Sequence, residues 1–110
     1  MTKISYSQAA IRDLEQIGDY IKKELKSPQA ALNTVSKIQD SIDKLADFPL
    51  IGAPLSAIVE ADTDYRFLVS GNYLAFYRPQ AGKILIDRIL HSRQNYLAIL
   101  FGNLPQDETE

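Results

Sequence analysis

Cysteine is absent from this 110-residue chain, and histidine occurs only once, as His91. Without cysteine the chain can form no disulfide framework and no thiolate metal site. A zinc site held by a protein usually needs several His or Cys ligands, which a single histidine cannot provide. We therefore expect no metal ion and no cofactor, and the composition is consistent with a cytoplasmic protein.

Long apolar runs are missing as well. No stretch approaches the ~20 apolar residues that cross a bilayer, and residues 1–13 hold no apolar run of the signal-peptide type. We therefore expect no contact with membranes. The chain is 45% hydrophobic, which suits one compact core at this length. We expect a single domain in residues 1–102 and a disordered acidic tail in residues 103–110.

Positive charge is concentrated in one third of the chain, although the formal net charge is only −2. Residues 1–64 and residues 102–110 each carry a net −3, whereas residues 65–101 carry a net +4. The basic residues of this third are Arg66, Arg78, Lys83, Arg88 and Arg93. The excess has two explanations, which are ordinary surface solubility and a surface that faces an anion or an acidic partner.

The spacing of apolar residues predicts two helices. In residues 8–25 they recur at three- and four-residue steps, as on one helix face, and Ser7 offers an N-cap. The pattern restarts after Ser27 and Pro28, which are a cap and a proline suited to the first helical position. It ends at "DFP" (47–49), because the residue before a proline avoids the α region. The short gap between the helices predicts an antiparallel hairpin.

β-branched and aromatic residues predict strands on both sides of the hairpin. A short strand, "KISY" (3–6), precedes the helices. An irregular crossing segment is expected at 49–64, followed by strands at 65–69, 72–78 and 83–90. The turns between the last three strands contain glycine and proline, as a meander requires.

Residues 93–102 are predicted to form a short closing helix that stops at Gly102. The predicted fold class is therefore α+β, with an N-terminal strand, an antiparallel helix hairpin, a three-stranded antiparallel meander and a short C-terminal helix. We expect a four-stranded sheet with the helices against one face. The other face, or its rim, would then be available for binding.

The stretch "RILHSRQNY" (88–96) places the only histidine at the end of a predicted buried strand, beside two arginines and a tyrosine. His91 is the only side chain whose ordinary pKa lies near neutrality. The two-residue period of a strand puts it on one face with Ile89 and Asp87. His91 is therefore either part of a site or a structural residue that hydrogen-bonds a turn.

Arg66 and Arg93, like His91, each have a structural and a functional explanation. Arg66 either serves a site or pairs with a nearby carboxylate such as Asp62 or Asp64. Arg93 falls at the start of the predicted last helix, where the helix dipole disfavours a cation. That unfavourable placement favours a functional role for Arg93.

The segments "FPLIGAP", "YRFL", "YLAFYR" and "RILHSRQNYLAIL" follow one another in an order that resembles the RelE/ParE superfamily of toxins, closest to its ParE branch. The resemblance covers roughly residues 2–101. It implies the small RelE/ParE α+β sheet and a growth-inhibiting toxin that a co-expressed antitoxin neutralises. ParE-like members poison DNA gyrase without being nucleases, whereas RelE-like members cleave mRNA on the ribosome.

Two departures from the RelE-like pattern argue against ribonuclease activity. RelE-like nucleases typically carry an arginine just after the tyrosine that opens the middle strand, and Leu74 occupies that place here. They also carry basic residues along the first meander strand, where Arg66 is present but Leu68 replaces the second. A pI near 5.3 also suits a protein target better than a polyanion such as the ribosome.

Cleavage of mRNA remains the alternative activity, and a non-toxic binding module of the same fold is a third. Metal-free RNA cleavage needs a base, an acid and cations for the phosphorane. The residues that could supply these groups are Arg66, His91, Arg93 and Tyr96. Tyr73 and Tyr77 also carry phenols, but they are more simply explained as core residues.

The resemblance further implies a hetero-oligomer with an antitoxin that carries a disordered acidic segment. Such a segment binds by folding, either as a helix in a groove of the hairpin or as a strand at the sheet edge. In the hairpin, Leu14 or Ile17 is expected to be incompletely covered. The candidates for contact with the antitoxin or the target are Arg66, Arg78, Arg88, His91 and Arg93.

Overall fold

The computed structural model describes residues 2–60 and 62–102, and the tail expected at residues 103–110 lies outside them. The elements are β1 (Lys3–Tyr6), α1 (Gln8–Leu25), α2 (Pro28–Asp43), the 3₁₀ turns η1 (Lys44–Ala46) and η2 (Leu55–Ala57), β2 (Ala53–Pro54), β3 (Arg66–Ser70), β4 (Tyr73–Gln80), β5 (Lys83–His91) and α3 (Tyr96–Phe101). Within the described residues, none of the helices combines the length and the apolar character that a bilayer span needs.

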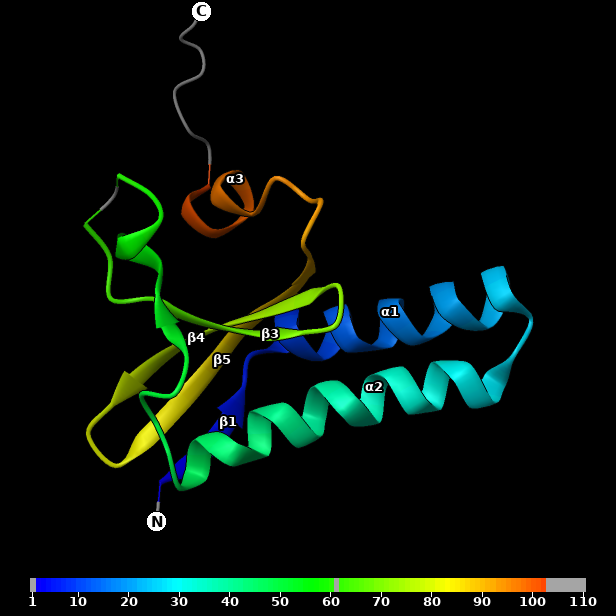
Figure 1. Cartoon of the computed structure of the whole chain (residues 1–110), viewed down its shortest axis with the longest axis horizontal. Helices are drawn as coiled ribbons and strands as arrows, with labels where there is room; N and C mark the ends of the chain where they lie inside the picture. Colours follow the sequence, from blue (N-terminus) through cyan, green and yellow to red (C-terminus); the bar gives the residue numbers. More distant parts are fainter. Residues whose placement is uncertain (1, 61, 103–110) are drawn as a thin grey trace, which may run out of the picture.

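Both helices of the hairpin begin at the predicted residues, because a side-chain cap fixes the start of each one. The Ser7 hydroxyl accepts a hydrogen bond from the Ala10 N–H at 2.9 Å, and Ser27 does the same for the Ala30 N–H at 3.1 Å. Between the helices Lys26 adopts the left-handed conformation, with φ of 51°. The chain can therefore reverse within a few residues, and α1 and α2 run side by side past the end of the sheet (Figure 1).

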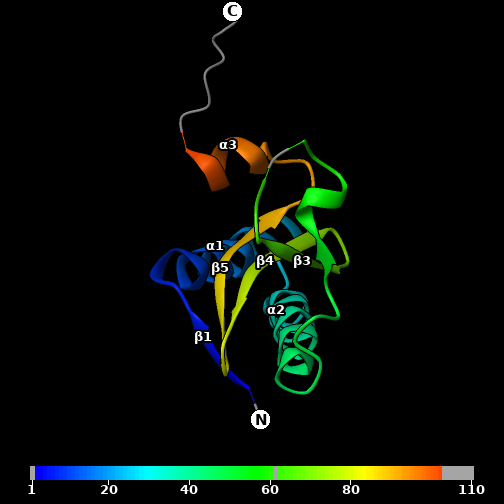
Figure 2. The same ribbon diagram turned by 90° about the vertical axis from the view of Figure 1, so that its left-hand side faces the viewer.

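The sheet has five strands in the order β1-β5-β4-β3-β2, so the expected count of four is wrong. The additional strand is β2, which lies inside the segment predicted as an irregular crossing and pairs antiparallel with β3. β1 pairs parallel with β5, from Lys3 opposite Lys83 to Tyr6 opposite Ile86. Figure 2 shows β1 at one edge, next to the antiparallel meander of β3, β4 and β5.

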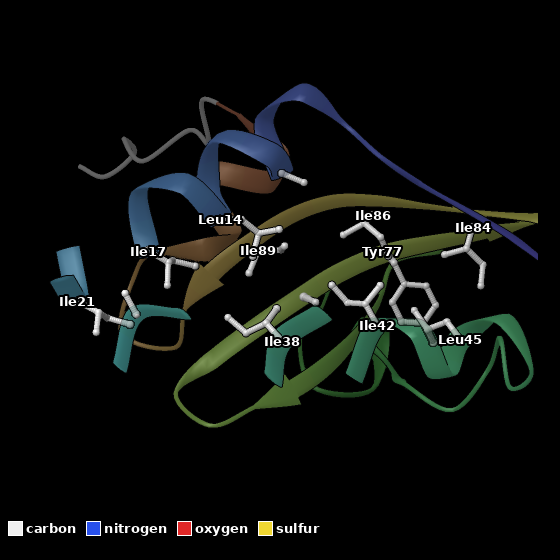
Figure 3. Packing of buried hydrophobic residues seen from close by; sticks show 13 residues of the cluster. Leu14, Ile17, Ile21, Ile38, Ile42, Leu45, Tyr77, Ile84, Ile86 and Ile89 are labelled. Carbon is white, nitrogen blue, oxygen red and sulfur yellow. The ribbon is translucent and has the colours of Figure 1, made fainter. Parts of the chain in front are cut away.

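One face of the sheet is covered by α1 and α2, and the residues buried there form the helix-facing cluster (Figure 3). Its largest fully buried members are Ile38, Ile42, Leu45, Tyr77, Ile84, Ile86 and Ile89. Leu14 and Ile17 also belong to it and are 9% exposed, so the two residues expected to be incompletely covered keep only a small exposed area. Among the apolar side chains that stay exposed on the hairpin are those of Ile11, Leu25 and Leu32.

The opposite face of the sheet is not free, contrary to expectation. Leu55, Tyr65, Phe76 and Leu90 are buried there, and we call them the second cluster. The half-buried side chains packed against them are those of Val59, Phe67, Leu74, Tyr96, Ile99, Leu100 and Phe101. The crossing segment and α3 therefore form a thin cover over this face, on the side of the sheet away from α2 (Figure 2).

A β-bulge interrupts the strand period in β5. Phe76 of β4 lies opposite Arg88, whereas the next residue, Tyr77, lies opposite Ile86, so Asp87 has no partner of its own. Ile86 and Ile89 both belong to the helix-facing cluster, although three positions separate them. The expectation that Asp87 shares a face with Ile89 is therefore wrong, because the inserted residue shifts the alternation by one.

Two element boundaries also differ from the prediction. β4 extends through Pro79 to Gln80, which leaves a tighter turn to β5 than expected. α3 begins at Tyr96 rather than at 93, because the Asn95 side chain caps it by accepting a hydrogen bond from the Ala98 N–H. Gly102 ends α3 with a positive φ of 73°, as predicted.

Candidate functional site

A buried ion pair joins α1 to β5 at the centre of the candidate site. Asp13 is 6% exposed, and its carboxylate accepts hydrogen bonds from Arg88 Nε at 2.8 Å and Nη2 at 2.9 Å. The Ile89 N–H donates a third hydrogen bond to the same carboxylate, at 2.9 Å. This pairing raises the pKa of Arg88 above its ordinary value, mainly through the hydrogen bonds to Asp13. Asp13 is therefore satisfied, and its charge is neutralised where it lies.

His91 ends β5 and is held in place by its own turn. The imidazole Nδ1 accepts a hydrogen bond from the Arg93 backbone N–H at 3.1 Å, and the His91 backbone N–H donates to Gln94 Oε1 at 2.8 Å. The imidazole and the Tyr73 ring meet edge to face, with centroids 5.3 Å apart. Because Nδ1 accepts, the neutral imidazole carries its proton on Nε2. His91 thus makes the turn contact that its structural interpretation predicts.

These groups line an open cavity of about 600 Å³ between α1, the β3–β4 turn and the end of β5, which we call the His91 cleft. Its lining residues are Asp13, Gln16, Ile17, Tyr20, Asn72, Tyr73, Arg88, Ile89, His91, Arg93 and Gln94. Three of the five predicted contact residues, Arg88, His91 and Arg93, therefore meet in one place. The cleft offers aromatic rings, amides and, within the described residues, one unpaired cation, Arg93, a combination that suits a partly apolar anion.

Arg93 lies in the turn before α3 and not in the helix, so the expected conflict with the helix dipole does not arise. Its backbone N–H is used by His91. Within residues 2–60 and 62–102 its guanidinium takes part in no hydrogen bond and no ion pair. Arg93 is thus an exposed cation at the mouth of the His91 cleft, placed there by the turn.

Arg66 is used to hold the chain that precedes β2. Its Nη1 donates a hydrogen bond to the Gly52 carbonyl at 2.6 Å. The buried Tyr77 hydroxyl accepts from the Gly52 N–H at 3.0 Å and donates to the Pro49 carbonyl at 2.9 Å. The expected pairing of Arg66 with Asp62 or Asp64 is therefore wrong, and the guanidinium serves a backbone carbonyl instead.

Arg78 is also occupied by neighbours in the fold. Its guanidinium carbon lies 4.2 Å from the centroid of the Tyr65 ring, and its Nε is 3.3 Å from Asp64 Oδ1. The Tyr65 hydroxyl in turn donates to Asp87. Burial, followed by this hydrogen bond, raises the pKa of Tyr65 to about 12. Arg78 and Tyr65 therefore stabilise the second cluster rather than the cleft.

The four residues that a nuclease would use are not brought together. Arg66 lies opposite Tyr77 of β4, and His91 lies opposite Tyr73 of the same strand. The two residues are therefore four β4 positions apart, which is ~13 Å along the strand. Tyr96 lies on the other face of the sheet, where its ring packs 5.3 Å from that of Phe76. Only His91 and Arg93 are neighbours, and the assignment of catalytic roles stays a prediction.

Sequence reasoning missed the residue on which the site is built. Asp13 lies three positions after Ala10 and four before Ile17, on the apolar stripe that becomes the buried face of α1. A charged residue inside such a stripe indicates a buried partner, since charges are almost never fully buried unpaired. Tyr20 and Asn72 were also missed, because only the fold brings α1 and the β3–β4 turn together.

Comparisons with known proteins identify the family. Residues 4–96 match the family described as "ParE toxin of type II toxin-antitoxin system, parDE". The chain is 38% identical over 52 residues to "Putative toxin Y4kP" of Sinorhizobium fredii, a match that covers 47% of this chain and 52% of that protein. The chain thus spans about half the length of this curated relative.

A solved structure titled "Chromosomal ParDE TA system from P. aeruginosa" is similar in fold, with a TM-score of 0.70 and 26% identity. The alignment covers 83% of this chain and 96% of that one. The family match extends over most of the described elements, from β1 to the start of α3. The chain belongs to the ParE toxin family of type II toxin–antitoxin systems.

Proposed function

We propose that this protein arrests bacterial growth by poisoning DNA gyrase in the cytoplasm, and that a cognate antitoxin neutralises it. The observation that carries the proposal is the match of residues 4–96 to the ParE family. The similarity to a ParDE system of P. aeruginosa supports the same role. The arrangement of residues gives independent support for one part of this proposal, which is that the target is a protein rather than RNA.

Leu74 is the first support for a protein target. RelE-like nucleases carry an arginine at this place, but here the side chain packs into the second cluster, beneath α3. In β4 it lies between Leu90 of β5 and Val69 of β3. An arginine would have to break this apolar packing to reach a substrate. The position therefore contributes to the fold and supplies no cation to a phosphate.

The placement of the other cations is the second support. Arg66, Arg78 and Arg88 each hold a partner inside the fold, at separate places on the sheet. A protein that binds the ribosome must present several cations to one phosphate backbone. Arg93 remains exposed at the His91 cleft, and one cation suits contact with an acidic protein surface better than contact with a polyanion.

The outer surface of the helix hairpin supports an antitoxin partner. Between α1 and α2 lies an apolar groove of about 660 Å³, which we call the outer groove. Ile11 and Leu32 line it and are 47% and 60% exposed. An amphipathic helix of the antitoxin would bury these side chains by lying in the groove. The antitoxin segment would fold as it binds.

Induced expression tests the growth arrest. The chain is expressed alone from an inducible plasmid, with soluble protein confirmed, and viable counts are followed. We expect arrest with filamentation and induction of the DNA-damage response before any loss of mRNA. Co-expression of the cognate antitoxin should restore growth.

Each part of the proposal has an outcome that contradicts it. Unchanged viable counts, with soluble protein present, would show that the chain is a non-toxic binding module. Codon-linked cuts in ribosome-bound mRNA, mapped by primer extension, would show that translation is the target. In that case His91 and Arg93 are the residues to mutate first.

A further inference from the structure

The His91 cleft has a buried floor and an exposed rim. The floor consists of lining residues that are themselves buried, which are Asp13, Ile17 and Ile89. The two isoleucines belong to the helix-facing cluster shown in Figure 3. Tyr20 and Arg93 line the cleft as exposed residues, so they stand at its rim. At about 600 Å³ the cleft falls within the ~300–1,000 Å³ that is usual for small-molecule sites.

The charges of the His91 cleft leave one cation without a partner. Asp13 is the only carboxylate among the described lining residues, and it accepts two hydrogen bonds from Arg88 and one from the Ile89 N–H. Burial raises the pKa of Tyr73, so this phenol adds no negative charge at neutral pH. With the imidazole neutral, one carboxylate and two guanidinium groups give the lining a net charge of +1, which belongs to Arg93.

The turn after β5 uses its own acceptors and leaves its donors over. The imidazole Nδ1 of His91 accepts from the Arg93 backbone N–H, so the neutral ring carries its proton on Nε2. The Gln94 side-chain oxygen accepts from the His91 backbone N–H, so only the amide NH₂ group remains. Within residues 2–60 and 62–102 neither of these donors, nor the Arg93 guanidinium, has an acceptor. All three residues line the cleft, and together they suit an anion.

Two aromatic side chains from different elements also line the His91 cleft. Tyr20 comes from α1 and is 62% exposed. Tyr73 comes from β4 and is half-buried, with its ring edge to face against the imidazole of His91. A ring of a ligand that contacts both tyrosines would bury apolar area and pack on aromatic faces or edges. The ligand that suits this lining therefore carries an aromatic group beside its anionic group.

The net charge of the cleft favours a singly charged anion over a doubly charged one. A phosphate monoester carries about −1.5 to −2 at pH 7, which exceeds the charge that Arg93 supplies. A carboxylate carries a single negative charge, and its two oxygens can accept from a guanidinium and from neutral N–H groups at the same time. The lining thus matches a carboxylate joined to an aromatic ring.

We propose that the His91 cleft binds an aromatic carboxylate. The carboxylate accepts hydrogen bonds from His91, Arg93 and Gln94, and the ring lies against Tyr20 and Tyr73. Two sources carry this chemistry, which are a free aromatic acid and an aromatic residue next to an acidic one in a partner protein. The inference goes beyond the proposed function, because it holds whichever macromolecule the toxin acts on.

NMR titration of the ¹⁵N-labelled full chain tests the proposal with matched probes at constant ionic strength. The first probe, 3-phenylpropanoate, carries both groups, whereas 3-phenylpropanamide lacks the charge and propanoate lacks the ring. We expect 3-phenylpropanoate to shift the backbone amides of Tyr20, Tyr73, His91, Arg93 and Gln94. It should bind about fivefold more tightly than either of the other probes, because an exposed ion pair and a partly covered ring each contribute modestly.

Two further probes identify the anion and its source. Benzyl phosphate has nearly the same spacing between ring and anion, and it should bind more weakly than 3-phenylpropanoate because of its second charge. N-acetylaspartylphenylalaninamide carries its carboxylate on the residue next to the ring. If this dipeptide binds at least as tightly as 3-phenylpropanoate, the source is a partner protein, and if it binds more weakly, the source is a free acid.

Variants of the chain assign the charged half of the ligand. Arg93→Gln should weaken binding of 3-phenylpropanoate about fivefold and leave that of 3-phenylpropanamide unchanged. The matched control is Lys83→Gln, which removes the same charge from an exposed site outside the cleft and should change neither affinity. Gln94→Glu keeps an oxygen that can accept from the His91 N–H but replaces the amide donors with a negative charge. Binding of the acid should then be lost while the amide still binds.

A change at Tyr20 tests the aromatic half. Tyr20 is 62% exposed, so Tyr20→Ser removes a ring from the rim of the cleft and little from the core. The affinities of 3-phenylpropanoate and 3-phenylpropanamide should fall by the same factor, because both probes carry the ring. Propanoate, which has no ring, should bind this variant as it binds the original chain.

Several outcomes overturn the proposal. One is that shifts gather at the outer groove, around Ile11 and Leu32, or that none occur. Equal affinities of the acid and its amide would show that the charge plays no part, and equal affinities of 3-phenylpropanoate and propanoate would show the same for the ring. Tighter binding of benzyl phosphate would make the cleft a phosphate site. Growth arrest is measured separately, so a failed toxin assignment is distinguished from a failed cleft.

Discussion

The two faces of the sheet are covered by very different amounts of structure. On one face α1 and α2, of 18 and 16 residues, bury a continuous layer of aliphatic side chains. On the other face α3 has six residues, none of them fully buried, and the layer beneath it is rich in aromatic rings. Aromatic residues cover more area per residue and can use a polar edge. A short cover can therefore close a face that would otherwise need a long helix.

The comparison implies that the helix-facing side supplies most of the stability and that the second cluster depends on a few larger contacts. Tyr65 illustrates such a contact, because it packs edge to face on Phe101, lies beneath the Arg78 guanidinium and donates to Asp87. Five predictions, ordered from the largest expected effect to the smallest, test this division.

Removing the Asp13 carboxylate should be the most destabilising change. Asp13→Ala leaves Arg88 with a partly buried unpaired charge and the Ile89 N–H without its acceptor. Breaking a buried ion pair in this way costs about 3–5 kcal/mol of unfolding free energy. Urea denaturation measures it, with Arg12→Ala at the neighbouring exposed position as the control. A loss below 1 kcal/mol would show that the pair does not hold α1 to β5.

Truncating one isoleucine on each face tests the comparison directly. Ile42 is fully buried against the sheet, and Ile42→Ala should cost about 3 kcal/mol because it leaves a cavity. Ile99 of α3 is only half-buried, and Ile99→Ala should cost about 1 kcal/mol. Chemical denaturation measures the loss of unfolding free energy in each variant, and the two losses can then be compared. Equal losses would mean that α3 is anchored as firmly as the helix hairpin.

Two glycine substitutions separate a crowded position from an open one. An added Cβ at Gly52 would lie 2.6 Å from the Tyr77 hydroxyl and 2.7 Å from the Phe67 carbonyl. Gly52→Ala should therefore destabilise the fold by about 1–3 kcal/mol through overpacking. Gly18→Ala meets only Val35, at 3.6 Å, and should stabilise α1 by about 0.5–1 kcal/mol. Thermal melts that shift in the same direction for both variants would contradict this reasoning.

The Tyr65 hydroxyl gives the second cluster a pH dependence. The folded protein keeps this proton up to a pKa of about 12, whereas an unfolded tyrosine releases it near 10. The folded state therefore binds more protons between these values, and stability must fall as pH rises from 10 to 12. Tyr65→Phe should lower the unfolding free energy by about 1 kcal/mol at pH 7. The stability of this variant should also fall less than that of the original protein as the pH rises above 10.

Denaturation series at pH 7, 10 and 11 measure the effect of Tyr65→Phe. The exposed Tyr20 provides the control, since Tyr20→Phe should leave the stability at pH 7 unchanged. An alkaline fall of unchanged size in Tyr65→Phe would show that the Tyr65–Asp87 hydrogen bond is not its cause.

Reversing the charge of Arg93 should leave stability nearly unchanged and alter association instead. The guanidinium has no partner in the described part of the chain, so Arg93→Glu removes no contact there. An acidic antitoxin should bind the variant with a severalfold lower on-rate at low salt, and the difference should vanish at high salt. Stopped-flow mixing measures it, with Lys83→Glu as the equal charge change elsewhere. An on-rate indifferent to both salt and Arg93→Glu would contradict the prediction.

The sequence predicted the helix-facing side well because its signals are local. Ser7 and the three- and four-residue spacing fix α1 at residues 8–25, as found. The second cluster was missed because its signals are not local. β2 has two residues, one of them Pro54, so no alternation can reveal it. The bulge at Asp87 depends on how β5 pairs with β4, which no property of β5 alone indicates.

The candidate site was predicted in part for the same reason. "RILHSRQNY" carries Arg88, His91 and Arg93 on one short stretch, and the fold places all three at the His91 cleft. Arg66 and Arg78 were grouped with them by charge alone, and the structure gives both of them partners elsewhere. Charge counted along a sequence does not show which side chains are already occupied.

The parallel pairing of β1 with β5 has a consequence for the order of folding during synthesis. Residues 3–6 must wait for residues 83–86 before this edge of the sheet can close. At ~5–20 residues per second, β5 follows β1 by about 4–16 s. The hairpin of α1 and α2 needs only residues that precede Lys44, so it can form within that interval. The His91 cleft needs residues up to Gln94, so it can be completed only after β5 has been synthesised.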